Sequence, residues 1–126
     1  MKESIRTPLG KVRGLGAAKE GAHHFIVQRV SAIALLFLLP WFLISALFAA
    51  RGGYQGAVDF VANPLNAVLA LMTVGASLYH MQIGMQVVIE DYIAKTGTRI
   101  FLLILNIFFA VVLFAAAAFS ILEIAT

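Results

Sequence analysis

The chain has 126 residues, of which 62% are hydrophobic and 12% are charged, and its formal net charge is +3. A soluble monomer needs a larger charged surface, so the composition excludes an ordinary soluble domain and favours an integral membrane protein. The sequence has no cysteine, which excludes disulfides, a thiol nucleophile, a CxxCH haem attachment and an iron–sulfur cluster held by this chain. No nucleotide-binding loop or hydrolase motif is present either, so we expect the chain not to be a catalyst by itself.

The first segment in chain order is a polar N-terminal arm, residues 1–29. Its first 24 residues include no apolar run of the kind that a secretory signal requires. The arm is basic, but Glu3 and Glu20 and the shortage of Ser argue against a transit peptide. We therefore predict that it is a cytoplasmic arm of the mature protein.

Residues 30–126 are predicted to be an all-α transmembrane anchor domain. They contain three uncharged stretches of 21, 25 and 23 residues, at 30–50, 65–89 and 100–122. At about 1.5 Å per residue, each stretch is long enough to cross roughly 30 Å of hydrocarbon as a helix. The segments between them, 51–64 and 90–99, are predicted to be connectors.

Glycine, proline and capping residues support these boundaries. Asn63-Pro64 combines a side-chain cap with a proline suited to the first helical turn, so the second helix should start there. Gly52-Gly53 should close the first span, while Gly97 and Thr98 fit a helix end and a new cap before the third. Pro40 lies inside the first span, where a kink is expected but spanning remains possible.

The basic residues predict the orientation of the spans. The arm and the second connector together carry eight, whereas the first connector carries one, Arg51, and the C-terminal tail none; the eight are Lys2, Arg6, Lys11, Arg13, Lys19, Arg29, Lys95 and Arg99. Cytoplasmic loops carry the excess of Lys and Arg. We therefore predict a cytoplasmic N-terminus and a periplasmic C-terminus, with the charge serving topology and attraction to anionic lipid rather than nucleic-acid binding.

His80 is an ionisable residue inside the second apolar stretch. It precedes Ile89, the expected cytoplasmic end of that span, by nine residues, which places it about 14 Å deep. Eleven residues at about 100° each bring Asp91 to the same helix face, with Gly84 one turn from His80 and Tyr92 at the boundary. An intramembrane ionisable group is a functional-site candidate, and a glycine beside it leaves room for a flat macrocycle or a closely packed helix.

A neutral imidazole in an apolar slot is well suited to bind haem iron. Six-coordinate haem needs a second ligand, and His23 and His24 should lie at the cytoplasmic surface, more than about 10 Å from the depth of His80. The second ligand would therefore come from another subunit. Periodicity alone supports equally well a histidine that only forms a hydrogen bond between helices.

Two motifs resemble the small hydrophobic membrane-anchor family of succinate dehydrogenase. The run HMQIGMQVVIEDY, residues 80–92, is similar to the family pattern H-x-x-I-G-M followed by D-Y. The run HHFIVQRVSAI, residues 23–33, is similar to the family's entry to the first helix, H-x-F-I-x-x-R-x-(S/T)-A-I. These motifs cover about a fifth of the chain, and the number and order of spans agree throughout.

The resemblance implies a complex that passes electrons from succinate, through FAD in a flavoprotein and the clusters of an iron–sulfur subunit, to ubiquinone at the membrane boundary. It implies that His80 is an axial ligand of haem b, that a second cytochrome b anchor subunit supplies the other ligand, and that Arg29 pairs with a haem propionate. It also implies that Tyr92 donates to a quinone carbonyl and that Asp91 orients an arginine or water there.

Each of these residues also has a simpler interpretation. Arg29 could extend toward lipid head groups, Asp91 could be a helix cap or pair with Lys95, and Tyr92 could belong to the interfacial aromatic belt. Ser31 and His23 could line the same mouth, but a serine is readily satisfied by its own helix carbonyl, and a surface histidine is usually solvated.

The sequence therefore predicts an all-α anchor subunit of succinate:quinone oxidoreductase in a bacterial inner membrane, with a mitochondrial inner membrane as the less favoured location. Alternatives are the anchor of a fumarate reductase, a structural or assembly subunit of another membrane complex without cofactor, and a homo-oligomeric ion or proton conductor. The sequence leaves open the quinone, the direction of electron flow, the need for haem in turnover and the number of copies in the complex.

Overall fold

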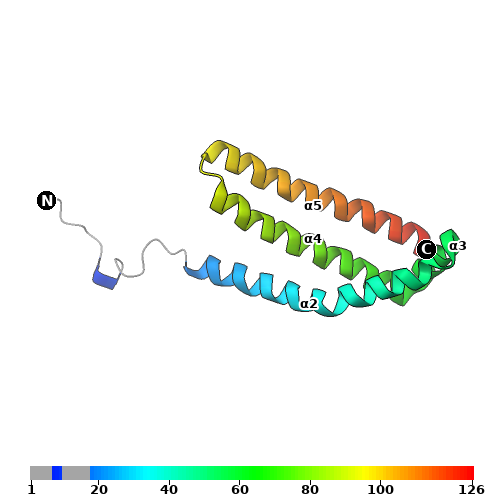
Figure 1. The fold of residues 1–126 in the computed structure, drawn as a ribbon. Coiled ribbons are helices and arrows are strands. Elements are labelled where there is room, and N and C mark those ends of the chain that lie inside the picture. Colours follow the sequence, from blue (N-terminus) through cyan, green and yellow to red (C-terminus); the bar gives the residue numbers. More distant parts are fainter. Residues whose placement is uncertain (1–6, 10–17) are drawn as a thin grey trace.

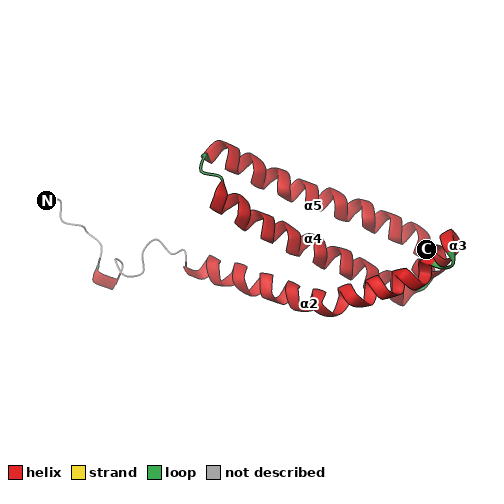
Figure 2. Ribbon diagram, in the orientation of Figure 1, coloured by secondary structure: helices red, strands yellow, loops and turns green. Residues whose placement is uncertain are grey.

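Helices account for nearly all of the described chain. The structure is a computed structural model that describes residues 7–9 and 18–126, and these residues contain no strand. The principal helices are α2 (Ala18–Ala50), α3 (Gly53–Ala62), α4 (Pro64–Tyr92) and α5 (Thr96–Ala125). Figure 2 shows that only short loops join them.

The three long helices lie side by side with α4 in the middle (Figure 1). Helix α4 contacts both α2 and α5, whereas α2 and α5 make no contact with each other in the described part of the chain. Most of the buried residues therefore belong to α4, namely Ala67, Ala70, Thr73, Ile83 and Ile89. The small side chains among them allow the neighbouring backbones to approach closely, as helix packing in membranes requires.

Three helices are long and apolar enough to cross a membrane: Gly21–Ala50, Pro64–Tyr92 and Thr96–Ala125. Their outer faces carry large apolar side chains that the described residues leave uncovered, such as Leu36 and Phe37, which are 68% and 72% exposed. Exposed apolar surface on this scale needs lipid or a partner protein. The predicted all-α architecture with three candidate spans is confirmed.

Several predicted helix boundaries agree with the structure. The side chain of Asn63 caps α4 by accepting hydrogen bonds from the backbone N–H groups of Leu65 and Asn66, and Pro64 occupies the first turn. Helix α2 ends at Ala50. Gly53, three residues later, has a φ of 60°, a value that glycine adopts without strain. Pro40 lies inside α2, which bends partway along its length (Figure 1).

Other boundaries differ from the sequence predictions. Helix α2 begins at Ala18, so helix extends into the predicted polar arm, and the predicted connector 51–64 contains α3. The prediction for Gly97 and Thr98 was wrong, because both lie inside the first turn of α5, whose N-cap is Lys95. Apolar length locates the part of a helix that suits hydrocarbon, and it leaves polar helical turns at the ends undetected.

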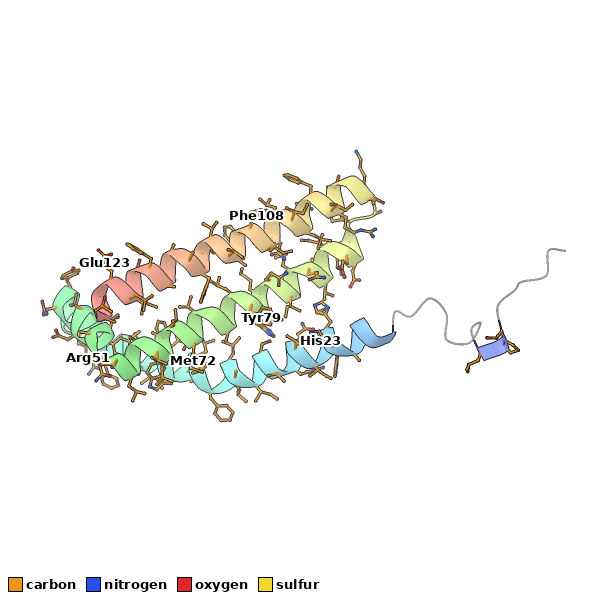
Figure 3. The ribbon with its side chains drawn as sticks, turned by 180° about the vertical axis from the view of Figure 1, so that it is seen from behind. His23, Arg51, Met72, Tyr79, Phe108 and Glu123 are labelled. Atoms are coloured by element: carbon orange, nitrogen blue, oxygen red, sulfur yellow. The ribbon has the colours of Figure 1, made fainter. Side chains whose placement is uncertain are left out.

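The connections between the helices lie at the two ends of the bundle. The start of α2 and the α4–α5 connection share one end (Figure 1), and Arg51 and Glu123 lie at the other (Figure 3). Lys95 and Arg99 are at the former end. Lys2, Arg6, Lys11 and Arg13 lie outside the described residues, and the orientation of the bundle in a membrane stays a prediction.

Buried polar side chains are satisfied within the chain. Asn106 of α5 donates its amide N–H to the backbone carbonyl of Gln82 of α4 at 2.8 Å, and the Thr73 hydroxyl donates to the Leu69 carbonyl at 2.7 Å. Among the described residues, no buried side-chain nitrogen or oxygen lacks a hydrogen-bond partner. This is the condition for placing polar groups where water is scarce.

The turn between α2 and α3 brings backbone against backbone. A Cβ added at Gly52 would lie 2.8 Å from the Cα of Gly56, and a Cβ at Gly56 would collide with the carbonyl oxygen of Ala49. Neither obstacle is a flexible side chain that could move aside. The sharp return of α3 along α2 therefore depends on glycine at position 56.

We predict that Gly56→Ala destabilises the protein by about 1–3 kcal/mol, the usual range for a methyl forced into filled space. The matched control is Gly97→Ala, because a Cβ at Gly97 meets nothing within 4 Å and alanine favours a helix by up to about 1 kcal/mol. Thermal unfolding in detergent should show a lower midpoint for the first variant only. Equal midpoints for the two variants would contradict the close packing of this turn.

Candidate functional site

His80 lies near the middle of α4. It precedes Tyr92, the last residue of the helix, by twelve positions, which corresponds to roughly 18 Å along the axis. Its side chain is half-buried within the chain. A depth of this size in a helix that spans the membrane keeps the imidazole away from bulk water at either end.

His80 contacts α2 through Ser31. The Nδ1 atom of His80 lies 2.9 Å from the Oγ atom of Ser31, which is itself only 8% exposed. The hydrogen bond between helices that periodicity allows for His80 is therefore present. It uses one ring nitrogen, so it does not compete with a ligand at the other.

The hydrogen bonds of Ser31 determine the protonation pattern of the ring. The Ser31 hydroxyl also lies 2.9 Å from the backbone carbonyl oxygen of Gln28, one turn earlier. A hydroxyl has a single hydrogen, and the carbonyl can only accept, so Ser31 donates to Gln28 and accepts from Nδ1–H of His80. In the neutral ring this arrangement places the hydrogen on Nδ1 and the lone pair on Nε2.

Gly84 leaves space on the helix face that carries His80. A Cβ added at Gly84 would meet no heavy atom within 4 Å, even though Gly84 is half-buried. Gly75, by contrast, approaches α5, because a Cβ there would lie 3.2 Å from the ring of Phe114. The chain therefore uses Gly75 for its own packing and leaves the surface at Gly84 open.

Asp91 and Tyr92 form the last turn of α4. Since α4 is continuous from Pro64 to Tyr92, Asp91 lies about 20° from His80 around the axis, three turns further on. Both side chains are exposed, Tyr92 by 81%. They are therefore accessible to a ligand or a partner at the membrane boundary.

Arg29 is on α2, two positions before Ser31. Its guanidinium lies 5.0 Å from the centroid of the Phe25 ring, and its side chain is exposed. Two helical positions correspond to about 200° of rotation, so Arg29 lies almost opposite Ser31 on α2. The structure does not bring it toward His80 within this chain.

A groove between α2 and α4 was not foreseen from the sequence. It encloses about 440 Å³ and is lined by His23, His24, Val27, Tyr79, Gln82, Ile83 and Gln86. Figure 3 labels His23 and Tyr79, which lie toward each other across α2 and α4. The two histidines are separated by more than fifty positions from the α4 residues, and no motif spacing connects them.

The described residues contain no group of three or more His, Cys, Asp or Glu side chains that could enclose a metal ion. A haem iron would need fewer ligands from one chain, because the porphyrin supplies four nitrogens and a single histidine can be the only ligand that this chain provides. Among the three histidines, all of which the structure describes, His80 alone lies more than two turns from either end of its helix. His23 lies eight positions before Ser31, roughly 12 Å along α2.

Comparison with known proteins agrees with this three-helix membrane subunit. The family described as succinate dehydrogenase/fumarate reductase transmembrane subunit matches residues 3–117. The succinate dehydrogenase hydrophobic membrane anchor subunit of Rickettsia bellii is 36% identical over 99 residues, 79% of each chain. The subunit of the same name from Rickettsia conorii is 34% identical over 92% of this chain and 93% of its own length. That of Paracoccus denitrificans is 31% identical over 90% and 88%.

The fold and the match together define a transmembrane subunit of the succinate dehydrogenase and fumarate reductase class. The chain belongs to this family and, within it, to the hydrophobic membrane anchor subunits of succinate dehydrogenase. The matched relatives named above are bacterial, which agrees with a place in a bacterial membrane. No solved structure matches the chain significantly.

Proposed function

We propose that this anchor subunit contributes an axial ligand to haem b and part of the ubiquinone site that receives electrons from succinate oxidation. The observation that carries the proposal is the state of His80. Its Nδ1 lies 2.9 Å from the Ser31 hydroxyl near the middle of a candidate membrane-spanning helix, and donation of that hydroxyl to Gln28 favours the tautomer that leaves the lone pair on Nε2. A neutral, oriented imidazole of this kind is what a haem iron binds.

The surroundings of His80 fit a haem. Gly84 leaves open space one turn away on the same face, where a side chain would otherwise stand, and no acidic or basic side chain other than His80 itself occurs between Pro64 and Ile89. When bound, haem b would accept and release single electrons. The second axial ligand would come from a histidine of the other cytochrome b anchor subunit, since His23 and His24 lie far along α2.

Tyr92 and Asp91 are proposed to serve the quinone. A quinone head needs hydrogen-bond donors for its carbonyl oxygens, while its isoprenoid tail must stay in lipid, so its site belongs at the membrane boundary. Tyr92 is exposed at the end of α4 and would donate its phenolic hydrogen to one carbonyl. Asp91 beside it would orient an arginine or a water molecule of the pocket.

Arg29 is proposed to pair with a haem propionate, because the charged arms of a buried macrocycle require a cationic partner. The family motif is the main support for this role. In the isolated chain the Arg29 guanidinium lies over the Phe25 ring, almost opposite Ser31 around the helix, so the propionate would have to approach α2 on the face opposite Ser31.

The uncovered apolar faces support assembly with other subunits. Three helices in this arrangement leave His80 half-buried and most large apolar side chains exposed. We propose that the second anchor subunit and lipid cover these faces. The iron–sulfur subunit would lie at the cytoplasmic end, near Tyr92, with the FAD-containing flavoprotein beyond it and the N-terminus of this chain on the same, cytoplasmic side of the inner membrane.

We predict that the purified complex has a low-spin haem b spectrum and that His80→Ala abolishes or sharply perturbs it, because alanine offers no ligand. Optical difference spectra of the reduced and oxidised complex measure this. His24→Ala serves as the control and should retain the spectrum. An unchanged spectrum in His80→Ala would refute ligation by this residue.

Gly84→Leu tests whether the open space beside His80 holds the macrocycle. A Cβ at Gly84 meets nothing within 4 Å in the isolated chain, so we expect the complex to assemble, but its haem content should fall at least tenfold if the porphyrin occupies that space. Gly97→Leu, in the first turn of α5 where an added Cβ also meets nothing within 4 Å, should retain full haem. Full haem in Gly84→Leu would place the macrocycle elsewhere.

Tyr92→Phe should leave the haem spectrum intact and lower quinone reduction by roughly fivefold to 150-fold, because a quinone carbonyl left without its donor costs about 1–3 kcal/mol. Succinate oxidation with an artificial dye acceptor should persist. Tyr54→Phe is the matched control, because Tyr54 is equally exposed, at 85%, but lies on α3 at the other end of the bundle. Quinone turnover equal to that of the parent would reject the role of Tyr92.

A further inference from the structure

We propose that Ser31 is a positioning residue for His80: its hydroxyl selects the Nδ1–H tautomer, fixes the plane of the ring and tunes the reduction potential of the haem that His80 would bind. This inference rests on the proposed ligation by His80. It is carried by the hydrogen bond between Ser31 Oγ and His80 Nδ1, at 2.9 Å, and by the second bond of the same hydroxyl to the Gln28 carbonyl.

Ser31 can act as a fixed acceptor because its own hydrogen is engaged. Donation to the Gln28 carbonyl, at 2.9 Å, directs a lone pair of Oγ away from that carbonyl. Ser31 is also 8% exposed, so water does not compete for the bond. A serine in a helix often bonds only to its own backbone. Here the same bond prepares the oxygen to accept from the imidazole.

The imidazole in turn has only one nitrogen left for a ligand. A histidine that binds metal usually donates its other ring N–H to an acceptor, which fixes the tautomer and ring orientation and raises the basicity of the ligating nitrogen. A more basic nitrogen stabilises ferric more than ferrous iron. The hydrogen bond to Ser31 should therefore keep the haem potential lower than it would be with an unanchored ring.

The test is a reductive titration of the haem in the purified complex. Ser31→Ala removes the acceptor, and we expect the ferrous form to be favoured roughly tenfold, the lower limit for loss of an outer-shell partner. For a one-electron couple, tenfold corresponds to about 59 mV toward more positive potential. Ser120→Ala is the matched control: Ser120 makes the same kind of bond, to the Ala116 carbonyl, but lies on α5 and should leave the potential unchanged.

Two variants with side chains of equal shape distinguish an effect of the Ser31 hydroxyl on the haem potential from an effect of packing. Ser31→Thr keeps the acceptor and should retain the parent potential, whereas Ser31→Val has the same volume without the oxygen and should shift it as alanine does. This pair decides the question even if Ser31→Ala fails to assemble. Identical potentials in the threonine and valine variants would overturn the proposal.

The outcome for Ser31 is distinguishable from the outcome for the site as a whole. If His80→Ala retains a normal haem spectrum, ligation by His80 is wrong and Ser31 has no haem to tune. If His80→Ala loses the haem while Ser31→Val keeps the parent potential, ligation stands and the positioning role of Ser31 is wrong.

Discussion

One hydrogen bond between α2 and α4, which joins Nδ1 of His80 to the hydroxyl of Ser31 at 2.9 Å, is the constraint on which the proposed site depends. Hydrogen bonds between membrane helices stabilise them by only about 0.6 kcal/mol on average, too little to explain an imidazole at this depth. Orientation is the larger effect. In our proposal the bond sets which nitrogen keeps its lone pair and the direction of that lone pair, and both properties matter for an iron ligand and neither for packing.

The rest of the fold places this bond. Helix α4 lies between α2 and α5; small residues such as Ala67 and Ala70 allow close packing, and Asn106 connects α5 to the carbonyl of Gln82, two positions after His80. The outward faces remain apolar and uncovered. Apolar faces of this kind agree with membership in a family of membrane anchor subunits.

Sequence reasoning identified the membrane class and the three spans, because apolar length is a local property. The orientation taken from the basic residues and the role of His80 stay predictions. Sequence reasoning also identified the Asn63 cap, whose chemistry lies within three residues. It missed α3, because a ten-residue helix is too short for an apolar window. It also misplaced the start of α5, which has Lys95 at its N-cap with no side-chain cap hydrogen bond and includes Gly97 in its first turn. The bond between Ser31 and His80 joins positions 49 apart. No pattern along the chain specifies such a contact, since it depends on how two helices are rotated against each other.

The most direct test of the account is an experimental structure of this chain in its assembled membrane complex, at a resolution that defines ring orientation. The account predicts a haem between this chain and a second anchor subunit, with Nε2 of His80 bound to the iron and Nδ1 still at hydrogen-bonding distance from Ser31. A His80 ring that faces acyl chains or an aqueous passage, with no porphyrin beside it, would contradict the central claim.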